Sequence, residues 1–442
     1  MPGPDRPLRI LLVSSRDPGG RRTGRKTVIA TIVGSLVELG HRVEVAALGP
    51  APLAPPPWGD AVPVHRLAPP GPLRIAANVA WQAGRGRMSL NECLFHSRPL
   101  GAAVAGLAAR MDADVVVADM IRTYGLAAST GRPVVVDLDD LLSERYRQMR
   151  RADPDTIVGY FGDYLPPVLR RPASVAAARL LSVESRLLAR RELQVASQAA
   201  VTCLVSAAEA QRLAARVGRP VEWSPMAVPV AASPAGGGAR RGPVFVGGMD
   251  YHANRQAVRW YRDAVLPELA AFGAGDLVLD VVGHCPDDLA RQLACDGIRF
   301  LGYASDLAAT LRRYRVAVAP VVSGTGIKTK VLEAMGMGLC VVSTPLGVAG
   351  LPVSHGEEVM VGGSARDFAA ALAELWADPD RASDIGERAR RVVAGQFSQE
   401  AAKERWRRIL RRVGEGSAGR LPSSGSADRP AAITARLERS GR

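Results

Sequence analysis

The chain has 442 residues, of which 47% are apolar and 5% aromatic, and its formal net charge is +14. The apolar fraction excludes a chain that is disordered throughout, and the length allows two or three domains with cores of their own. The positive charge suits nucleic acid, an anionic membrane surface or a phosphorylated substrate. Because no Arg-rich segment is interleaved with aromatic residues, we expect no nucleic-acid partner.

Cysteine and histidine patterns indicate neither a disulfide framework nor a metal site. The five cysteines are scattered without a CxxC pair, and the six histidines show no HExxH spacing. We therefore expect no metal and no cofactor. No apolar run approaches the about 18 residues of a membrane span, and the N-terminus lacks a signal-peptide pattern, which predicts a cytoplasmic protein.

The first half begins with a βαβ unit, in which a Gly- and Arg-rich loop (16–27) precedes a helix (28–40). Strands are expected over 8–15, 41–48, 112–119, 132–140 and 200–206. In open α/β sheets, ligands collect at the carboxyl ends of the strands. Charged residues near those ends are therefore candidates to face a cleft: Asp119, Arg122, Asp137 and Asp140. Capping of the next helix is an equally consistent role for Asp140.

The loop after the first strand also resembles a phosphate loop with one residue too many. Four residues separate Gly19 from Gly24, but Arg25 then precedes Lys26 and Thr27. In a phosphate loop, Lys and Ser/Thr follow the second glycine directly, so that the lysine reaches the phosphates. A P-loop-like kinase or NTPase at Gly19–Thr27 is an alternative that the extra residue disfavours.

A basic helical region (165–199) and a Pro/Gly/Ala-rich linker (227–243) end the first half. The helix suits an anionic membrane surface, which would place the protein peripherally on the inner face of the membrane, or a solvated helix face. The linker is the predicted domain boundary.

The second half alternates strands and helices again. Strands are expected over 244–248, 277–283, 298–304, 315–320 and 340–344, and helices over 254–270, 306–314, 365–378, 381–397 and 398–413. The residues from 414 to 442 are rich in Ser, Gly, Pro and Arg, which predicts a disordered tail.

The stretch SGTGIKTKVLEAMGMG (323–338) follows a strand and contains a Gly-rich loop and the start of a helix. This arrangement binds anions, because a helix N-terminus offers free N–H donors and partial positive charge. Lys328 and Lys330 lie at that end, where each charge costs roughly 0.3–1 kcal/mol unless an anion is bound. Glu333 offers two acceptor oxygens that suit a ribose diol. A surface Lys330–Glu333 pair on a packed helix is the structural alternative.

Several segments resemble glycosyltransferase family 4 (group 1), and most closely the exopolysaccharide and PEP-CTERM-associated sugar transferases. In the second half they are VFVGGMDYHANRQAVRWYRDAVLPEL (244–269), VVGHCP (281–286), FLGYASDLAATLRRYRVAVAPVVSGTGIKTKVLEAMGMG (300–338) and VVSTPLGVAGL (341–351). In the first half they are the Gly-Gly loop, VVVDLDDLLSERY (134–146) and VSAAE (205–209).

The resemblance implies an α/β chain of GT-B architecture, with two Rossmann-like domains facing across a cleft. The N-terminal acceptor domain would span 1–226, completed by the helix at 398–413, and the nucleotide-sugar domain would span 244–397. By resemblance, the catalytic residues are Asp119, Lys328, Lys330 and Glu333. The donor-binding residues are Gly19, Gly20, Gly247, Asn254, Arg255, Gly283, Gly324, Thr325, Gly326 and Ile327.

Two positions depart from the family pattern. Thr325 stands where the first glutamate of the Glu, seven residues, Glu motif would be, and Glu333 is the second. Asp119 stands where many members carry a histidine that touches the transferred sugar. The family implies retention of configuration without a metal, because cations and the helix N-terminus stabilise the leaving group. An inverting enzyme would need a general base, for which Asp119 or Asp137 would serve.

The predicted function is therefore transfer of a sugar, of the hexosyl type, from a nucleoside-diphosphate donor to an acceptor hydroxyl in polysaccharide or glycoconjugate synthesis. The acceptor remains open among a glycan, a lipid-linked sugar and a small molecule. Two alternatives also remain, the P-loop-like enzyme and a basic module that binds anionic membrane or nucleic acid.

Overall fold

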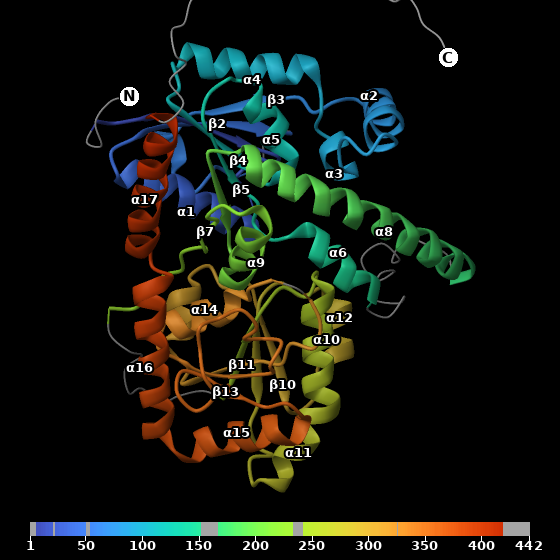
Figure 1. The fold of residues 1–442 in the computed structure, drawn as a ribbon. Helices are drawn as coiled ribbons and strands as arrows, with labels where there is room; N and C mark the ends of the chain where they lie inside the picture. Colours follow the sequence, from blue (N-terminus) through green and yellow to red (C-terminus); the bar gives the residue numbers. More distant parts are fainter. Residues whose placement is uncertain are drawn as a thin grey trace, which may run out of the picture.

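The computed structural model describes residues 6–20, 23–49, 54–151, 167–232, 242–324 and 326–418. Its strands form two sheets, of seven strands in the order β3-β2-β1-β4-β5-β6-β7 and of six in the order β10-β9-β8-β11-β12-β13. Neighbouring strands within each sheet run parallel. Figure 1 shows the two sheets in separate halves of the molecule, one above the other.

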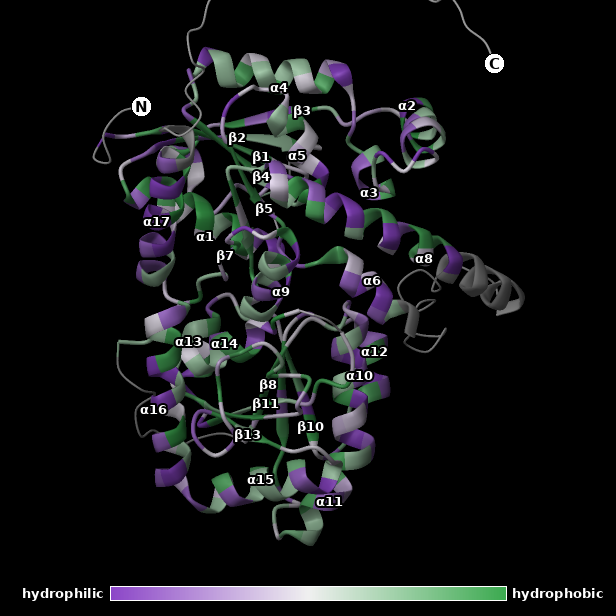
Figure 2. Ribbon diagram, viewed as in Figure 1, coloured by the Kyte–Doolittle hydropathy of each residue, from purple (hydrophilic) through white to green (hydrophobic). Residues whose placement is uncertain are grey.

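The strands of the first sheet are β1 (Arg9–Ser14), β2 (Arg42–Leu48), β3 (Val64–Leu67), β4 (Val115–Asp119), β5 (Val134–Asp137), β6 (Val201–Leu204) and β7 (Glu222–Trp223). Those of the second are β8 (Val244–Val246), β9 (Leu279–Val282), β10 (Ile298–Gly302), β11 (Val316–Ala319), β12 (Cys340–Ser343) and β13 (Met360–Val361). Figure 2 shows that the strands are the most hydrophobic part of each half.

Helices cover both faces of each sheet. In the first half they are α1 (Gly24–Glu38), η1 (Gly59–Ala61), α2 (Pro72–Asn78), η2 (Val79–Ala83), α3 (Leu90–Cys93), α4 (Arg98–Arg110), α5 (Ile121–Ala128), α6 (Leu142–Arg151), α8 (Pro167–Gln198) and α9 (Ala207–Val217). In the second they are α10 (His252–Trp260), η4 (Tyr261–Val265), α11 (Leu266–Ala271), α12 (Asp287–Leu293), α13 (Leu307–Leu311), α14 (Thr329–Gly336), α15 (Ala365–Ala377), α16 (Pro379–Gln396) and α17 (Gln399–Ala418).

The central strands are buried on both faces, which explains their continuous apolar sequences. In β1, Ile10 and Leu12 belong to one core cluster while Leu11 and Val13 belong to another. Alternate side chains of a strand point to opposite faces, so each sheet separates two layers of packed helices.

The edge strands β3, β7 and β13 were not predicted. Each is short, and the last two consist of two residues. The four residues of β3 are Val, His, Arg and Leu, of which none is fully buried. A short edge strand with polar residues has no apolar run that would distinguish it from a loop.

Helix α1 begins four residues earlier than the predicted residue 28. Thr23 has an extended backbone, and its side chain accepts a hydrogen bond from the Lys26 N–H at 3.4 Å. Threonine caps helices in this way, so the helix begins at Gly24. The end of the predicted loop is therefore the first turn of a helix.

The chain crosses between the halves twice, after β7 and between α16 and α17. At these crossings the Val228 N–H donates to the Phe397 carbonyl at 2.8 Å, and the Phe397 ring meets Trp223 edge-on at 5.7 Å. Helix α17 then lies beside α1, where Gln399 donates to Ser35 Oγ at 3.3 Å (Figure 1). Within the predicted linker, residues 233–241 lie outside the described residues. The predicted tail begins too early, because α17 continues to Ala418, and residues 419–442 also lie outside the described part.

Candidate functional site

Two cavities of about 680 Å³ each lie between the halves and meet at three residues that line both. These shared residues are Thr23 and Gly24 at the N-terminus of α1 and Thr329 at the N-terminus of α14. We name each cavity after a residue that lines it and does not line the other. They are the Glu333 cavity and the Arg122 cavity.

The N-termini of α1 and α14 approach each other closely. A Cβ atom added to Gly24 would lie 3.8 Å from Thr329 Oγ1. Each of these helices presents N–H donors and partial positive charge at its first turn. Two helix N-termini therefore converge where the cavities meet, which is a suitable place for an anion.

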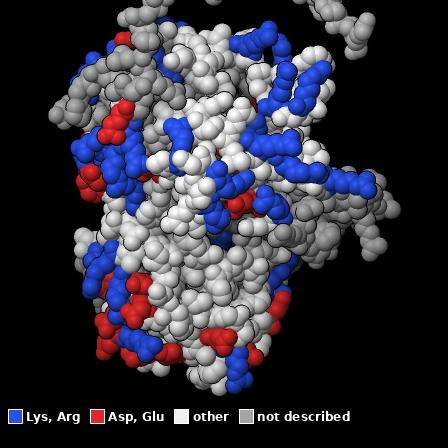
Figure 3. All heavy atoms as spheres, in the orientation of Figure 1, with Lys and Arg blue, Asp and Glu red and all other residues white. Residues whose placement is uncertain are grey.

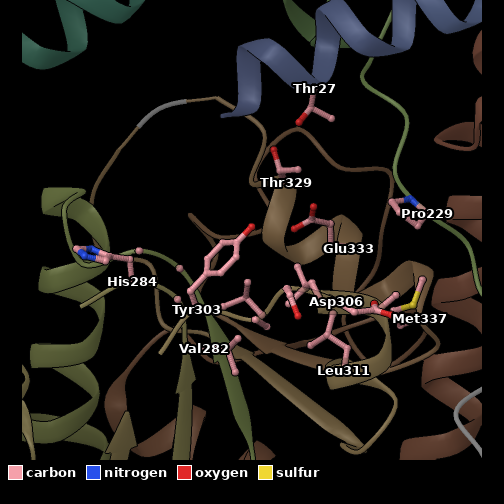
Figure 4. A pocket seen from close by; sticks show the side chains of 18 of the residues that line it. Thr27, Pro229, Val282, His284, Tyr303, Asp306, Leu311, Thr329, Glu333 and Met337 are labelled. Carbon is pink, nitrogen blue, oxygen red and sulfur yellow. The ribbon is translucent and has the colours of Figure 1, made fainter. Parts of the chain in front are cut away.

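The Glu333 cavity is walled by loops at the carboxyl ends of the second sheet. Gly247 follows β8, Gly283 follows β9 and Tyr303 follows β10. Figure 4 shows the Glu333 carboxylate and the Tyr303 ring directed into this space from different sides, with Thr27 of α1 above them. An exposed aromatic ring, a carboxylate and glycine-lined walls suit a flat, polar ligand with a diol.

Glycine is required in two of these walls. Gly283 has φ = +146°, and a Cβ atom added to it would lie 2.4 Å from the Gly247 carbonyl oxygen. A Cβ atom on Gly247 would lie 2.6 Å from the Asn254 amide nitrogen, which donates to the Gly248 carbonyl at 2.7 Å. Asn254 thus fixes the β8 loop from behind the cavity.

Lys330 lies behind the cavity wall, in the first turn of α14. Its ammonium donates to Asn254 Oδ1 and stands 4.3 Å from the centre of the Phe245 ring. Burial, followed by the nearby charge of Lys328, lowers the pKa of Lys330 to about 7, against a smaller raising effect of Glu333. An anion at the α14 N-terminus would restore the positive charge of this lysine.

Lys328 belongs to the Arg122 cavity. Its ammonium donates to the carbonyls of Gly324 at 3.1 Å and Gly326 at 2.8 Å, and so holds the Gly-rich loop together. Burial, followed by the charge of Arg145 from the opposite half, lowers the pKa of Lys328 to about 8. The two halves therefore bring cations together across the cavity.

The Arg122 cavity has a strongly charged wall in the N-terminal half. Among its lining residues there are Arg16, Arg25, Arg122, Asp139, Asp140, Arg145, Glu209 and Arg212. Figure 3 shows one face of the molecule, and on this face lysine and arginine side chains gather over the N-terminal half. The opposite wall is the loop that contains Gly324, Gly326 and Ile327.

Asp119 is buried in an ionic cluster and lines neither cavity. Its Oδ1 accepts from Arg25 Nε at 2.5 Å, and its Oδ2 accepts from Ser14 Oγ at 2.8 Å and the Ser15 N–H at 3.2 Å. Arg25 also pairs with Asp137 at 3.0 Å. Both carboxylate oxygens of Asp119 therefore accept hydrogen bonds from other residues of the cluster.

The prediction that four charged residues face the cleft is right for Arg122 and Asp140, which line the Arg122 cavity. It is wrong for Asp119 and Asp137, which are buried against Arg25. A residue at the end of a central strand also touches the helix that covers the sheet, and here that helix supplies a buried arginine.

The glycine pair of the first loop does not line either cavity. The Gly19 carbonyl accepts from the Lys26 ammonium, and the Gly20 N–H donates to the Ala54 carbonyl at 2.9 Å. Because Lys26 lies on α1 and bonds to its own loop, the geometry of this loop does not favour a P-loop-like site.

The other predicted donor residues are distributed around α14. Arg255 lies on α10, and its Nη1 donates to the carbonyls of Met249 at 3.0 Å and Asp250 at 3.2 Å in the loop after β8. Thr325 lies outside the described residues. Thr23 and Tyr303 line the cavities but were not predicted from the sequence. Threonine is a common N-cap residue, and Tyr303 lies near the carboxyl end of a predicted strand, so both residues could have been identified as candidates.

Two family models match this chain. The model described as glycosyl transferases group 1 matches residues 240–378, and the model described as a glycosyl transferase 4-like domain matches residues 23–229. A Klebsiella pneumoniae protein, described as an uncharacterized 44.6 kDa protein in the cps region, is 29% identical over 127 residues. That alignment covers 27% of this chain and 32% of the Klebsiella protein.

Solved structures share the fold along most of the chain. Anabaena Alr3699/HepE in complex with UDP superposes with a TM-score of 0.60 at 15% identity, over 91% of this chain and 100% of that chain. Sucrose-phosphate synthase from Thermosynechococcus elongatus gives a TM-score of 0.61 at 16% identity, over 92% of this chain and 99% of that chain. These likenesses confirm the predicted α/β class and GT-B architecture.

Within the part of the chain that the structure describes, no helix is long and apolar enough to cross a membrane. The two matched regions correspond to the two halves that meet at the cavities, with α14 and its Gly-rich loop inside the second region. The chain belongs to the group 1 glycosyltransferases, with a GT-B fold.

Proposed function

We propose that this protein transfers a sugar, of the hexosyl type, from a nucleoside-diphosphate donor to an acceptor hydroxyl. One observation carries the proposal, the convergence of the α1 and α14 N-termini between a cavity lined by Glu333 and a cavity lined by Lys328. A diphosphate at this point would join a nucleoside in the Glu333 cavity to a sugar in the Arg122 cavity.

The Glu333 cavity is assigned to the nucleoside. The Glu333 carboxylate would accept from the ribose hydroxyls, and the Tyr303 ring, which is 77% exposed, is free to stack on the base. The Anabaena protein of the same fold has been crystallised with UDP and with UDP-glucose, which supports a uridine nucleotide here. The cps-region relative supports a link to polysaccharide synthesis.

The departing diphosphate is assigned to α14 and its lysines. Negative charge grows on the diphosphate as the glycosidic bond breaks, so donors placed at that position lower the barrier. Lys330 and Lys328 lie in the first turn and at the N-cap of α14, where they add charge to the helix N-terminus. We propose that these groups stabilise the leaving group without a metal.

Retention of configuration is part of the proposal. The two residues that would serve an inverting enzyme as base, Asp119 and Asp137, are buried against Arg25. Asp140 is the rival base, because it lines the Arg122 cavity and burial raises its pKa to about 7 even beside Arg145. The anomeric proton coupling of the glycoside product, measured by NMR and compared with that of the donor, distinguishes retention from inversion.

Glu333→Ala is expected to weaken nucleotide binding about 10- to 100-fold, because hydrogen bonds to a charged group contribute about 1.5–3 kcal/mol. The melting temperature should stay within about 2 °C, since the carboxylate lines a cavity instead of filling the core. Isothermal titration with UDP measures the affinity. Asp276→Ala removes an exposed carboxylate from the same half and is the control. A large loss of stability with intact affinity would assign Glu333 a structural role.

Affinity for an intact nucleotide sugar is expected to fall as the pH rises from 7 to 9. The pKa values of Lys330 and Lys328 in the free protein are about 7 and about 8, and an anionic ligand requires both lysines protonated. Above the pKa that a lysine has in the free protein, the need to protonate that lysine lowers the affinity by up to about tenfold for each further pH unit. The diphosphate of a nucleotide sugar does not titrate in this range. Lys330→Met should flatten the dependence, and an unchanged slope would contradict this reading.

A further inference from the structure

Arg122 is a half-buried cation that forms no ion pair among the described residues. Its Nε is inaccessible to water and meets no hydrogen-bond acceptor, and its guanidinium lies 5.9 Å from the Phe95 ring. Burial, and then the charge of Arg16, lower the pKa of Arg122. An arginine in this position costs free energy unless a ligand supplies negative charge.

The other arginines of the same wall already have carboxylate partners. Arg25 pairs with Asp119 and Asp137, Arg145 with Asp140, and Arg212 with Glu144 at 2.7 Å. In the described part of the chain, no such ion pair joins Arg122 or Arg16 to a carboxylate. The charge of Asp119 acts on both residues without pairing with either, and for Arg122 it is outweighed by burial and by the charge of Arg16. These two residues therefore form a positive wall that no ion pair of the described residues neutralises.

The turn that places Arg122 is strained. Met120 has φ = 67° and ψ = 162°, a region that side-chain-bearing residues rarely adopt, and it lines the Arg122 cavity. It also occupies the N-cap of α5 without a side-chain acceptor for the first N–H groups of the helix. Met120 and Arg122 both line the Arg122 cavity, so the strained turn places the start of α5 at this cavity. A helix N-terminus beside an arginine favours an anion.

This wall shares the Arg122 cavity with Lys328 but belongs to the N-terminal half, opposite the loop that carries Lys328. The donor's diphosphate has its own cations at α14, in the second half, and Arg122 does not line the Glu333 cavity. Arg122 faces the space between the N-terminal half and the Gly324–Lys328 loop, where the acceptor must approach the donor sugar.

We propose that the acceptor carries a negatively charged oxygen group, a carboxylate or a phosphate, which Arg122 and Arg16 bind in the Arg122 cavity. The inference rests on the proposed function. A planar guanidinium binds either group through paired hydrogen bonds. Two sources supply this chemistry, a uronic acid residue of a glycan and the diphosphate of a lipid-linked sugar.

Matched pairs of ligands test the inference on the protein saturated with UDP. Methyl glucuronide is compared with methyl glucoside, and farnesyl-diphosphate-linked glucose with farnesyl glucoside, by isothermal titration. At least one charged member should bind ten times or more tightly than its neutral partner, and the pair that shows this identifies the source. Equal binding within both pairs would overturn the inference.

Three variants assign the preference to residues. Arg122→Met should abolish it, Arg122→Lys should restore part of it, and Arg16→Met provides an independent variant should Arg122→Met not fold. Arg212→Met is the matched control, because Arg212 lines the same cavity but is paired with Glu144 and half exposed.

Binding of UDP in the absence of acceptor separates the two proposals. UDP should bind these variants as it binds the unaltered protein. Loss of UDP binding in Arg122→Met would show that Arg122 contributes to donor binding, which would overturn the inference. Absence of UDP binding in the unaltered protein would contradict the proposed function, and the inference with it.

Discussion

Lys330→Met is expected to lower the turnover number about 100- to 1,000-fold while changing the donor's KM far less. Removal of one preorganised donor to a developing negative charge has an effect of about this size in other enzymes. The charge of the diphosphate is greater in the transition state than in the bound donor, so the loss falls mainly on turnover. Release of UDP from the nucleotide sugar measures both constants.

The ammonium of Lys330 lies over the Phe245 ring, and methionine is an unbranched apolar side chain that can fill the same space, so the variant removes the charge with little change in packing. Lys328→Met is the comparison. Its ammonium already bonds to the Gly324 and Gly326 carbonyls, so its removal should affect loop order as well as turnover. A raised KM with unchanged turnover in Lys330→Met would show that Lys330 binds only the ground state.

Arg25→Met is expected to destabilise the protein by about 3–5 kcal/mol, because removal of one partner leaves buried charges uncompensated. Arg25 pairs with Asp119, with Asp137 at 3.0 Å and with Asp139 at 3.2 Å, and its side chain is 5% exposed. Urea unfolding at pH 7 measures the loss. Arg132→Met is the control, because Arg132 pairs with Asp112 at 3.1 Å where both side chains are well exposed, and the pair should contribute about 1 kcal/mol or less.

The loss in Arg25→Met should be smaller at pH 5 than at pH 8. Burial raises the pKa of Asp119, but Arg25 and Ser14 outweigh it and hold that pKa below its usual value. Without Arg25, burial would dominate, and the folded-state pKa values of the carboxyl groups would exceed their unfolded values. Stability then falls as the pH rises through the folded pKa values. A loss that is independent of pH would indicate that Arg25 contributes through packing alone.

The sequence located α14 because a strand, a Gly-rich loop and a helix are local signals. The helix begins at Thr329, within the stretch 323–338 in which its start was predicted, and Glu333 lines a cavity. The orientation of Lys330 was not predictable, because its partner Asn254 lies 76 residues away on another helix. Whether Lys330 pairs along its own helix or across to a neighbour depends on the packing of the two helices.

The interpretation of Asp119 shows the same limit. Its place at the end of β4 predicted a residue facing the cleft, yet Arg25, which lies 94 residues earlier, reaches it from α1. The late helix start in the prediction concealed this contact, because it left Arg25 in a loop. Once Thr23 is recognised as the N-cap, Arg25 lies in the first turn of α1, close to the ends of the central strands.

Binding of nucleotides to the unaltered protein tests the central claim most directly. UDP, GDP, dTDP, ADP and ATP are each titrated calorimetrically, with magnesium and with EDTA. We expect one nucleoside diphosphate, UDP in the first place, to bind equally well in both conditions, since the helix N-termini and lysines take the charge. The contrary result is that only ATP binds, that its binding requires magnesium, and that Lys26→Ala abolishes it. This result would contradict the account and place the site in the first loop.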